Sequence, residues 1–134
     1  MDNKELMNKA IKAREFAYAP YSHFKVGAAL VAKNGNVYLG ANIENSAYSP
    51  SVCAERVAFF KAVSEGIREF DAIAIVGGKE GKISSLCAPC GVCRQVMSEF
   101  CDKNFKIVLG TPEKFEIHTF AELFPLAFSK DDVK

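Results

Sequence analysis

Two short motifs hold the residues best suited to chemistry, three cysteines and a glutamate. The first is Cys53-Ala54-Glu55-Arg56, and the second is Pro89-Cys90-Gly91-Val92-Cys93-Arg94-Gln95. Cys-x-x-Cys spacing lets two thiolates at the start of a helix bind one metal, because the first turn brings both sulfurs to one side. Soft sulfur in tetrahedral geometry favours zinc, with Zn–S bonds near ~2.3 Å. Cys53, Cys90 and Cys93 therefore predict a zinc site that activates water at an open fourth position.

Charge balance singles out the residues beside these cysteines. Three thiolates outweigh the charge of one Zn²⁺, so the site acidifies water poorly unless charge is drawn from the sulfurs. Arg56 lies three residues after Cys53 and can reach back to them. Arg94 is a second candidate, although a surface or subunit-contact role fits it equally well. Glu55 lies beside the metal without being an obvious ligand, which suits a carboxylate that moves protons between water and a substrate nitrogen.

Two helices must present these motifs at their first turns, where partial positive charge favours thiolate over thiol. We expect one helix to run from near Cys53 to Gly66, a natural C-terminal cap. The other is expected to run from Cys90–Gly91 to about Cys101.

The remaining segments predict a sheet and its covering helix. Residues 3–18 show apolar residues at helical spacing, an Asp2–Glu5 capping box and a stop at Pro20. Strands are predicted at 25–32, 36–41, 70–76, 105–109 and 115–118, the first two joined by a type I′ turn at Asn34-Gly35. A loop at 77–82, a short helix between Thr119 and Pro125 and a frayed tail at 129–134 complete the chain. Residues 1–134 thus predict one α/β domain, a three-layer sandwich with helices packed on a mixed five-stranded sheet.

Composition narrows the class of protein. A chain of 134 residues that is 49% hydrophobic and 25% charged is typical of one soluble globular domain. The net charge of +1 argues against a surface built for nucleic acid but leaves room for a small nucleoside. No apolar run approaches a membrane span, and the charged start Met1–Glu5 does not resemble a secretory signal. Five cysteines, an odd number, indicate a reducing cytoplasm in which thiols serve metal binding or chemistry.

Other interpretations of the cysteines remain open at this point. A Cys-x-x-Cys pair alone is more often a structural zinc half-site or a redox pair than a catalytic site. A structural zinc needs a fourth protein ligand, for which His23, His118 and Cys87 are the candidates. Neither interpretation gives a role to Glu55, so the two motifs together favour catalysis.

The two motifs together resemble those of the zinc-dependent cytidine deaminases, a pattern of the wider zinc deaminase class. The short homotetrameric branch is the most similar, and the resemblance extends from Ala17 to Phe128. It implies that zinc is held by Cys53, Cys90 and Cys93 and that Glu55 is the proton shuttle. It also implies a substrate pocket in which Phe24 packs on the pyrimidine and the backbone of Ala54 and Ala88 meets the base. Asn42 and Glu44 would bind the ribose. Tyr48 and Phe128 would lie at subunit boundaries.

The implied activity is hydrolysis of cytidine and deoxycytidine to uridine and deoxyuridine, with release of ammonia, in pyrimidine salvage. The implied protein is a cytoplasmic homotetramer with one zinc per chain, residues of neighbouring subunits in each pocket, and neither nucleic acid nor membrane as a partner. The alternatives are another cytosine-containing substrate, such as a polynucleotide or a nucleoside antibiotic, and a zinc-stabilised binding module. Two departures stand out: segment 77–88 is longer than in this branch and contains Cys87, which we expect to be a free thiol, and Leu126 stands where the family often has glycine.

Overall fold

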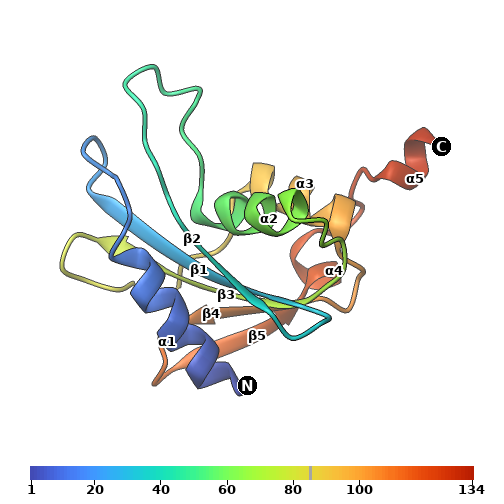
Figure 1. Cartoon of the computed structure of the whole chain (residues 1–134), viewed down its shortest axis with the longest axis horizontal. Coiled ribbons are helices and arrows are strands. Elements are labelled where there is room, and N and C mark those ends of the chain that lie inside the picture. The colour runs from blue at the N-terminus through green and yellow to red at the C-terminus, as the bar shows by residue number, and fades with distance from the viewer. Residues whose placement is uncertain (85) are drawn as a thin grey trace.

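A five-stranded mixed sheet forms the centre of the molecule (Figure 1). The structure is a computed structural model that describes residues 1–84 and 86–134, so residue 85 of the predicted loop lies outside it. The strands are β1 (Phe24–Ala32), β2 (Val37–Ala41), β3 (Phe70–Lys79), β4 (Lys106–Gly110) and β5 (Phe115–Thr119). Their order is β2-β1-β3-β4-β5, with β3 and β4 parallel and the other neighbours antiparallel. The predicted mixed sheet of five strands is confirmed.

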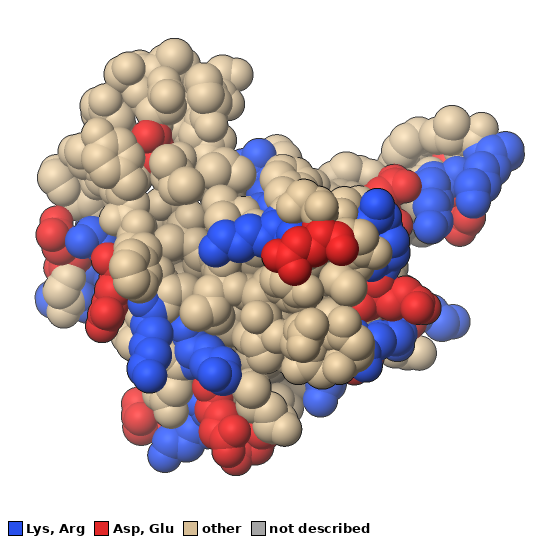
Figure 2. Space-filling model, viewed as in Figure 1, with Lys and Arg blue, Asp and Glu red and all other residues tan. Residues whose placement is uncertain are grey.

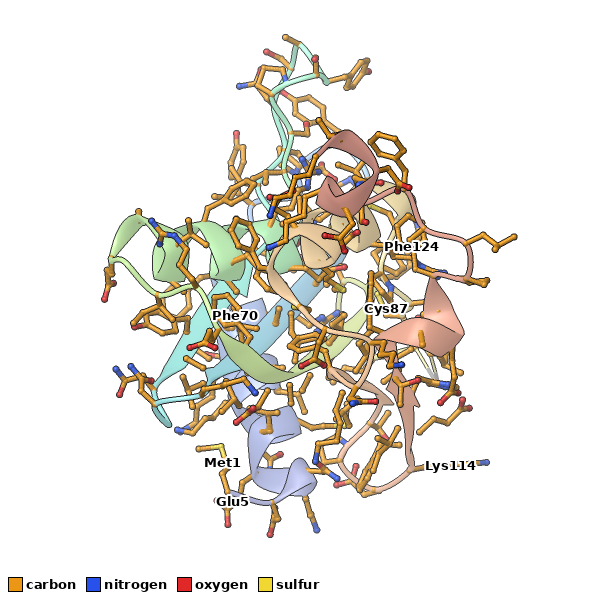
Figure 3. All side chains as sticks on the ribbon, turned by 90° about the vertical axis from the view of Figure 1, so that its right-hand side faces the viewer. Met1, Glu5, Phe70, Cys87, Lys114 and Phe124 are labelled. Atoms are coloured by element: carbon orange, nitrogen blue, oxygen red, sulfur yellow. The ribbon has the colours of Figure 1, made fainter. Side chains whose placement is uncertain are left out.

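Helices cover both faces of this sheet. Helix α1 (Asn3–Arg14) lies on one face, and α2 (Ala54–Ser64) and α3 (Gly91–Phe100) lie on the other (Figure 1). Two short helices, α4 (Phe120–Leu123) and α5 (Lys130–Val133), follow near the carboxyl end. In Figure 3, Met1 and Glu5 mark the α1 side of the sheet and Phe124 marks the opposite side. The predicted three layers are therefore present, and none of the described helices is long and apolar enough to cross a membrane.

Each face of the sheet has its own hydrophobic core, because successive side chains of a strand point to opposite sides of the sheet. The α1 side carries mostly small residues from the sheet, Ala29, Ala72, Ala74, Val76 and Val108. The opposite side carries larger ones, Leu30, Ile73, Ile75, Ile107 and Leu109, under α2 and α3. The face that seats the two cysteine-bearing helices is thus the more heavily packed.

Two glycines let helices approach the sheet at backbone distance. A Cβ on Gly27 of β1 would lie 2.0 Å from the carbonyl oxygen of Ala10 in α1. A Cβ on Gly40 of β2 would lie 2.2 Å from the carbonyl oxygen of Ala54 in α2. Each helix is therefore seated where a side chain would otherwise stand.

Four predicted boundaries differ from the structure. Helix α1 ends at Arg14 rather than at residue 18, because Tyr18 leaves the helix to pair with the 42–44 segment. The hairpin turn spans Ala32–Gly35 with Gly35 alone left-handed (φ 91°), so the predicted type I′ turn is wrong while the hairpin itself is right. Strand β3 continues to Lys79, through residues predicted as loop, because they pair with the start of β1. The tail predicted as frayed contains α5, opened by a capping box at Ser129.

Candidate active site

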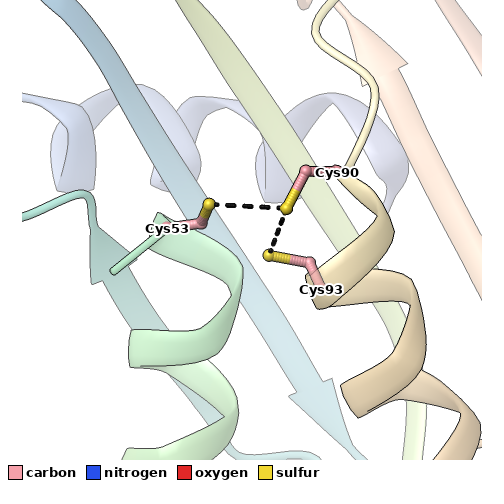
Figure 4. Close-up of side chains that lie close together, drawn as sticks. All are labelled: Cys53, Cys90 and Cys93. Atoms are coloured by element: carbon pink, nitrogen blue, oxygen red, sulfur yellow. Dashed lines mark hydrogen bonds between the residues drawn. The ribbon is translucent and has the colours of Figure 1, made fainter. Parts of the chain in front are cut away.

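Three cysteine sulfurs meet where the starts of α2 and α3 converge (Figure 4). Cys53 is the N-cap residue of α2, Cys90 is the N-cap residue of α3, and Cys93 lies in the first turn of α3. The Cys53–Cys90 and Cys90–Cys93 sulfur distances are 3.6 and 3.5 Å, and all three sulfurs lie within 4.8 Å of one another. Tetrahedral zinc with Zn–S bonds of ~2.3 Å separates its sulfur ligands by about 3.8 Å. The donor set therefore fits one zinc ion.

The metal group has three protein ligands among the described residues. The candidates for a fourth ligand lie elsewhere: His23 faces Glu80 at 3.7 Å, and His118 faces Glu116 at 2.9 Å. Cys87 lies outside the group, and burial raises the pKa of its thiol to about 11. Three ligands with room for another is the pattern of catalytic rather than structural zinc sites.

Arg56 contacts the sulfurs, as the charge balance requires. Its Nη2 donates to Cys53 Sγ at 3.6 Å. Hydrogen bonds from Cys93 and Arg56 lower the pKa of Cys53 to about 5, whereas donation to Cys53 raises the pKa of Cys93. Arg56 Nε is buried and has no hydrogen-bond partner among the described residues, so a donor remains available beside the sulfurs.

Glu55 is a buried carboxyl group in the first turn of α2, only 4% exposed. Burial, with a smaller contribution from the Cys53 thiolate, raises the pKa of Glu55 to about 7. A carboxyl group with this pKa can both accept and give up a proton near neutral pH.

A pocket of about 330 Å³ opens beside Glu55 and the sulfurs. It is lined by Ser22, Phe24, Val26, Asn42, Glu44, Ser51, Val52, Cys53, Glu55, Arg56, Cys87, Ala88 and Cys90. The structure thus brings Phe24, Asn42, Glu44 and Ala88 to the same cavity as the metal group. Its volume suits a ligand the size of a nucleoside.

The side chains of Asn42 and Glu44 are held by the segment before and within β1. Asn42 Oδ1 accepts from the Val26 amide at 2.8 Å, and its Nδ2 donates to the Phe24 carbonyl at 2.9 Å. The Glu44 carboxylate accepts from the Tyr21 and Ser22 amides and from the Ser22 hydroxyl. The Ser22 hydroxyl contributes most to lowering the pKa of Glu44, so this carboxylate is ionised.

Five predicted residues lie outside the pocket lining, and one of them is Cys93, the buried cysteine of the metal group. Ala54 is fully buried behind Cys53. Tyr48 is 74% exposed on the 43–52 arm, with its ring edge-on to Tyr21, and Phe128 is 62% exposed. Arg94 donates to the carbonyls of Pro89 and Leu123 rather than to a sulfur, so its contacts are those of a residue that braces the loop before Cys90.

Four other pocket residues are not among the predicted site residues. Ser22, Val26, Ser51 and Val52 line the cavity although they belong to neither cysteine motif. Ser22 and Ser51 are small polar residues in turns, and Val26 and Val52 resemble core residues. Their place in the pocket depends on how the turn before β1 and the 43–52 arm fold over it.

Comparisons with known proteins point to one family. Residues 1–109 match the family model described as the cytidine and deoxycytidylate deaminase zinc-binding region. The cytidine deaminase of Sporosarcina psychrophila is 54% identical over 134 residues, which cover 99% of this chain and 96% of that protein. The cytidine deaminase of Halalkalibacterium halodurans is 48% identical, with coverage of 99% and 98%.

Solved structures agree with these relatives. The crystal structure of cytidine deaminase from Burkholderia pseudomallei matches with a TM-score of 0.86 at 46% identity, covering 96% of this chain and all of that one. The cytidine deaminase of Mycobacterium tuberculosis matches with a TM-score of 0.80 at 34% identity, covering 96% and 98%. The similarity therefore extends over nearly the whole chain in sequence and in fold.

Proposed function

Because this chain belongs to the zinc-dependent cytidine deaminase family, we propose that it hydrolyses cytidine and deoxycytidine to uridine and deoxyuridine with release of ammonia. One observation carries the proposal: two cysteines of a three-cysteine metal group line a nucleoside-sized pocket together with a buried carboxyl group. A structural zinc module has no use for an open ligand position beside a buried acid.

Cys53, Cys90 and Cys93 hold the zinc ion, which supplies Lewis-acid activation of water when it is bound. Arg56 donates to Cys53 and draws negative charge from the sulfurs, together with the amino ends of α2 and α3. Arg94 instead braces the loop before Cys90 by donating to the carbonyl of Pro89.

Glu55 moves the protons of the reaction. It takes a proton from the attacking water and gives it to N3 of the pyrimidine, and it then takes the proton of the resulting C4 hydroxyl and gives it to the amine, which leaves as ammonia while the C4 carbonyl forms. Burial supports this role, because a carboxyl group removed from solvent exchanges its proton with substrate rather than with bulk water.

The remaining pocket residues orient the nucleoside. Phe24 packs on the pyrimidine ring, and the backbone of Ala88 faces its polar edge. The backbone of Ala54, which is next to Cys53 but outside the pocket lining, is proposed to meet the same edge. Asn42 and Glu44 bind sugar hydroxyls. On the face shown in Figure 2, acidic and basic side chains are interspersed, which supports a small substrate over a polynucleotide backbone.

The protein is proposed to work as a cytoplasmic homotetramer in pyrimidine salvage. The exposed aromatic rings of Tyr48 and Phe128 support an assembly in which each chain extends the pocket of a neighbour. Sedimentation at micromolar concentration tests this part, and a monomer would contradict it.

The activity is tested by following cytidine absorbance on a sample whose zinc content is measured. We expect about one zinc per chain and rapid conversion to uridine. Glu55→Gln is expected to lower kcat about 10²- to 10⁴-fold with zinc retained. Glu65→Gln, the same change at the exposed end of α2, is the matched control and should behave as wild type.

Three results would contradict the proposal in different ways. If Glu55→Gln turns over cytidine as fast as wild type does, Glu55 is not the proton shuttle. If the protein deaminates a cytosine oligonucleotide as fast as cytidine, its substrates include polynucleotides. If it binds zinc but deaminates neither substrate, it is a zinc-stabilised binding module.

A further inference from the structure

The Glu44 carboxylate is seated in a turn that lies 22 residues before it in the chain. Its Oε1 accepts from two consecutive backbone amides, Tyr21 N at 3.0 Å and Ser22 N at 3.1 Å. The next residue, His23, has a left-handed backbone (φ 58°), and its amide closes the turn onto the Ala19 carbonyl at 3.0 Å. Successive amides followed by a left-handed residue form a concavity that binds anions. The turn is therefore shaped around this one carboxylate.

The hydroxyl of Ser22 adds a third donor and a second connection. Ser22 Oγ donates to Glu44 Oε2 and accepts from the Phe24 amide at 3.0 Å. All three residues line the same pocket. Because a serine hydroxyl has a single proton, and that proton is used on Glu44, Ser22 has no donor left for a ligand.

Counting acceptor sites shows what Glu44 has left for a substrate. A carboxylate offers about two lone-pair sites on each oxygen. The two backbone amides occupy both sites on Oε1, and the Ser22 hydroxyl occupies one site on Oε2. One acceptor site remains, and it is on the oxygen that Ser22 holds. Its direction is therefore set by the Ser22 hydroxyl.

Asn42 is held by strand β1 rather than by the turn before it. Its amide is hydrogen-bonded to the backbone of Phe24 and Val26 in β1, and none of the hydrogen bonds among the described residues joins it to Ser22. A change at Ser22 therefore acts on the Glu44 half of the sugar site and leaves the Asn42 amide held by β1.

We propose that Ser22 is a positioning residue for sugar recognition: its hydroxyl aims Oε2 of Glu44 so that this oxygen accepts one hydroxyl proton from the bound nucleoside. The inference rests on the proposed function, because it takes a nucleoside as the ligand. It goes beyond that function because the preference for one sugar over another would then depend on Ser22, which need not touch the substrate.

The test measures binding rather than turnover, with the zinc-loaded full chain and two ligands that cannot be deaminated. Uridine carries the sugar 2′- and 3′-hydroxyls, and 2′,3′-dideoxyuridine lacks both. We expect Ser22→Ala to weaken uridine binding about tenfold in calorimetry, as befits a hydrogen bond to a charged group, and to change dideoxyuridine binding less than twofold. Ser22→Thr keeps the hydroxyl and should restore uridine binding to within threefold of wild type.

Two controls separate positioning from general damage. Ser64→Ala removes an exposed serine hydroxyl bonded to the Lys61 carbonyl, away from the pocket, and should bind both ligands as wild type does. In a Glu44→Ala background, Ser22→Ala should weaken uridine binding no further, because the residue it positions is gone. Ser22 is exposed, so we expect its variants to fold, which circular dichroism checks.

Equal losses for uridine and dideoxyuridine in Ser22→Ala would overturn the inference, since they would indicate a disturbed base site at Phe24. A full Ser22→Ala loss that persists without Glu44 would overturn it as well, and so would a wild-type protein that binds the two ligands equally. Failure of the wild type to deaminate cytidine is a separate result. It contradicts the proposed function, while the contrast between the two ligands still reports on Ser22.

Discussion

Replacing Gly40 by alanine tests whether the sheet positions the metal group through α2. The added Cβ would lie 2.2 Å from the Ala54 carbonyl oxygen and 2.7 Å from the Ala58 amide nitrogen. Cβ contacts below 3.0 Å essentially do not occur, so the start of α2 must move by about 0.8 Å. That segment carries Cys53 and Glu55, and it has to move relative to the two cysteines of α3.

The expected magnitude follows from the size of this shift. Overpacking against backbone costs about 3 kcal/mol, and with an unfolding entropy of about 2.1 cal/mol/K per residue this lowers Tm by roughly 10 °C. Zinc ligand distances are held to about 0.2 Å, and a misplacement of about 1 Å in an active site can lower a rate about 10²-fold. Gly40→Ala should therefore lose zinc to a chelator more readily and lose about 10²-fold in kcat/KM, well below its Tm.

Gly27→Ala is the matched control, because its Cβ would lie 2.0 Å from the Ala10 carbonyl oxygen and displace α1 on the opposite face. We expect a similar fall in Tm with cytidine turnover within about threefold of wild type. Tm by calorimetry, zinc by a metal-binding dye and turnover by absorbance are measured on all three proteins. If Gly40→Ala is destabilised but keeps wild-type zinc affinity and turnover, or if both variants lose turnover equally, the coupling between β2 and the metal group is refuted.

Two further changes probe the carboxyl-terminal half. Arg94→Met removes hydrogen bonds to the Pro89 and Leu123 carbonyls, so it should lower Tm by a few degrees. Zinc should still be bound at one per chain. Loss of zinc at an unchanged Tm would instead indicate that Arg94 balances the charge of the sulfurs. The hydrogen bond to Glu116, with a smaller contribution from Glu122, raises the pKa of His118, so its stabilisation is complete below about pH 6.5 and lost as pH rises through the folded value. The Tm advantage of wild type over His118→Gln should therefore shrink with rising pH, and a difference that stays flat from about pH 5 to pH 9 would contradict this assignment.

The metal ligands could be predicted from the sequence because their signals are local. Cys53, Cys90 and Cys93 stand at helix starts that the surrounding residues mark, and the spacing of the last two is fixed by one turn. The approach of Cys53 to Cys90 depends on sheet order, because α2 and α3 must lie on the same face before their sulfurs can meet. The donor chemistry of the two motifs and the family resemblance, rather than periodicity, supplied that expectation.

Other features depend on contacts that no local pattern encodes. The apolar pattern of the first helix continues past Arg14, yet the helix ends there because Tyr18 pairs with a segment 25 residues later. Ser22 is an exposed serine in a turn, and its importance arises only when Glu44 folds against it. Arg94 stands in a cysteine motif, which suggested a role at the sulfurs, but its side chain extends to Pro89 and Leu123.

Cysteines at the N-caps of α2 and α3 have a practical consequence for handling the protein. Neither cysteine makes a side-chain capping hydrogen bond, whereas serine or aspartate at an N-cap commonly stabilises a helix by about 1 kcal/mol. A metal ion bound by Cys53, Cys90 and Cys93 would join the two helix starts. A batch stripped of metal during purification should keep its sheet and α1, and pass circular dichroism and gel filtration, while the first turns of α2 and α3 exchange their amide protons rapidly. A preparation should therefore be judged by its metal content per chain rather than by evidence that the protein is folded.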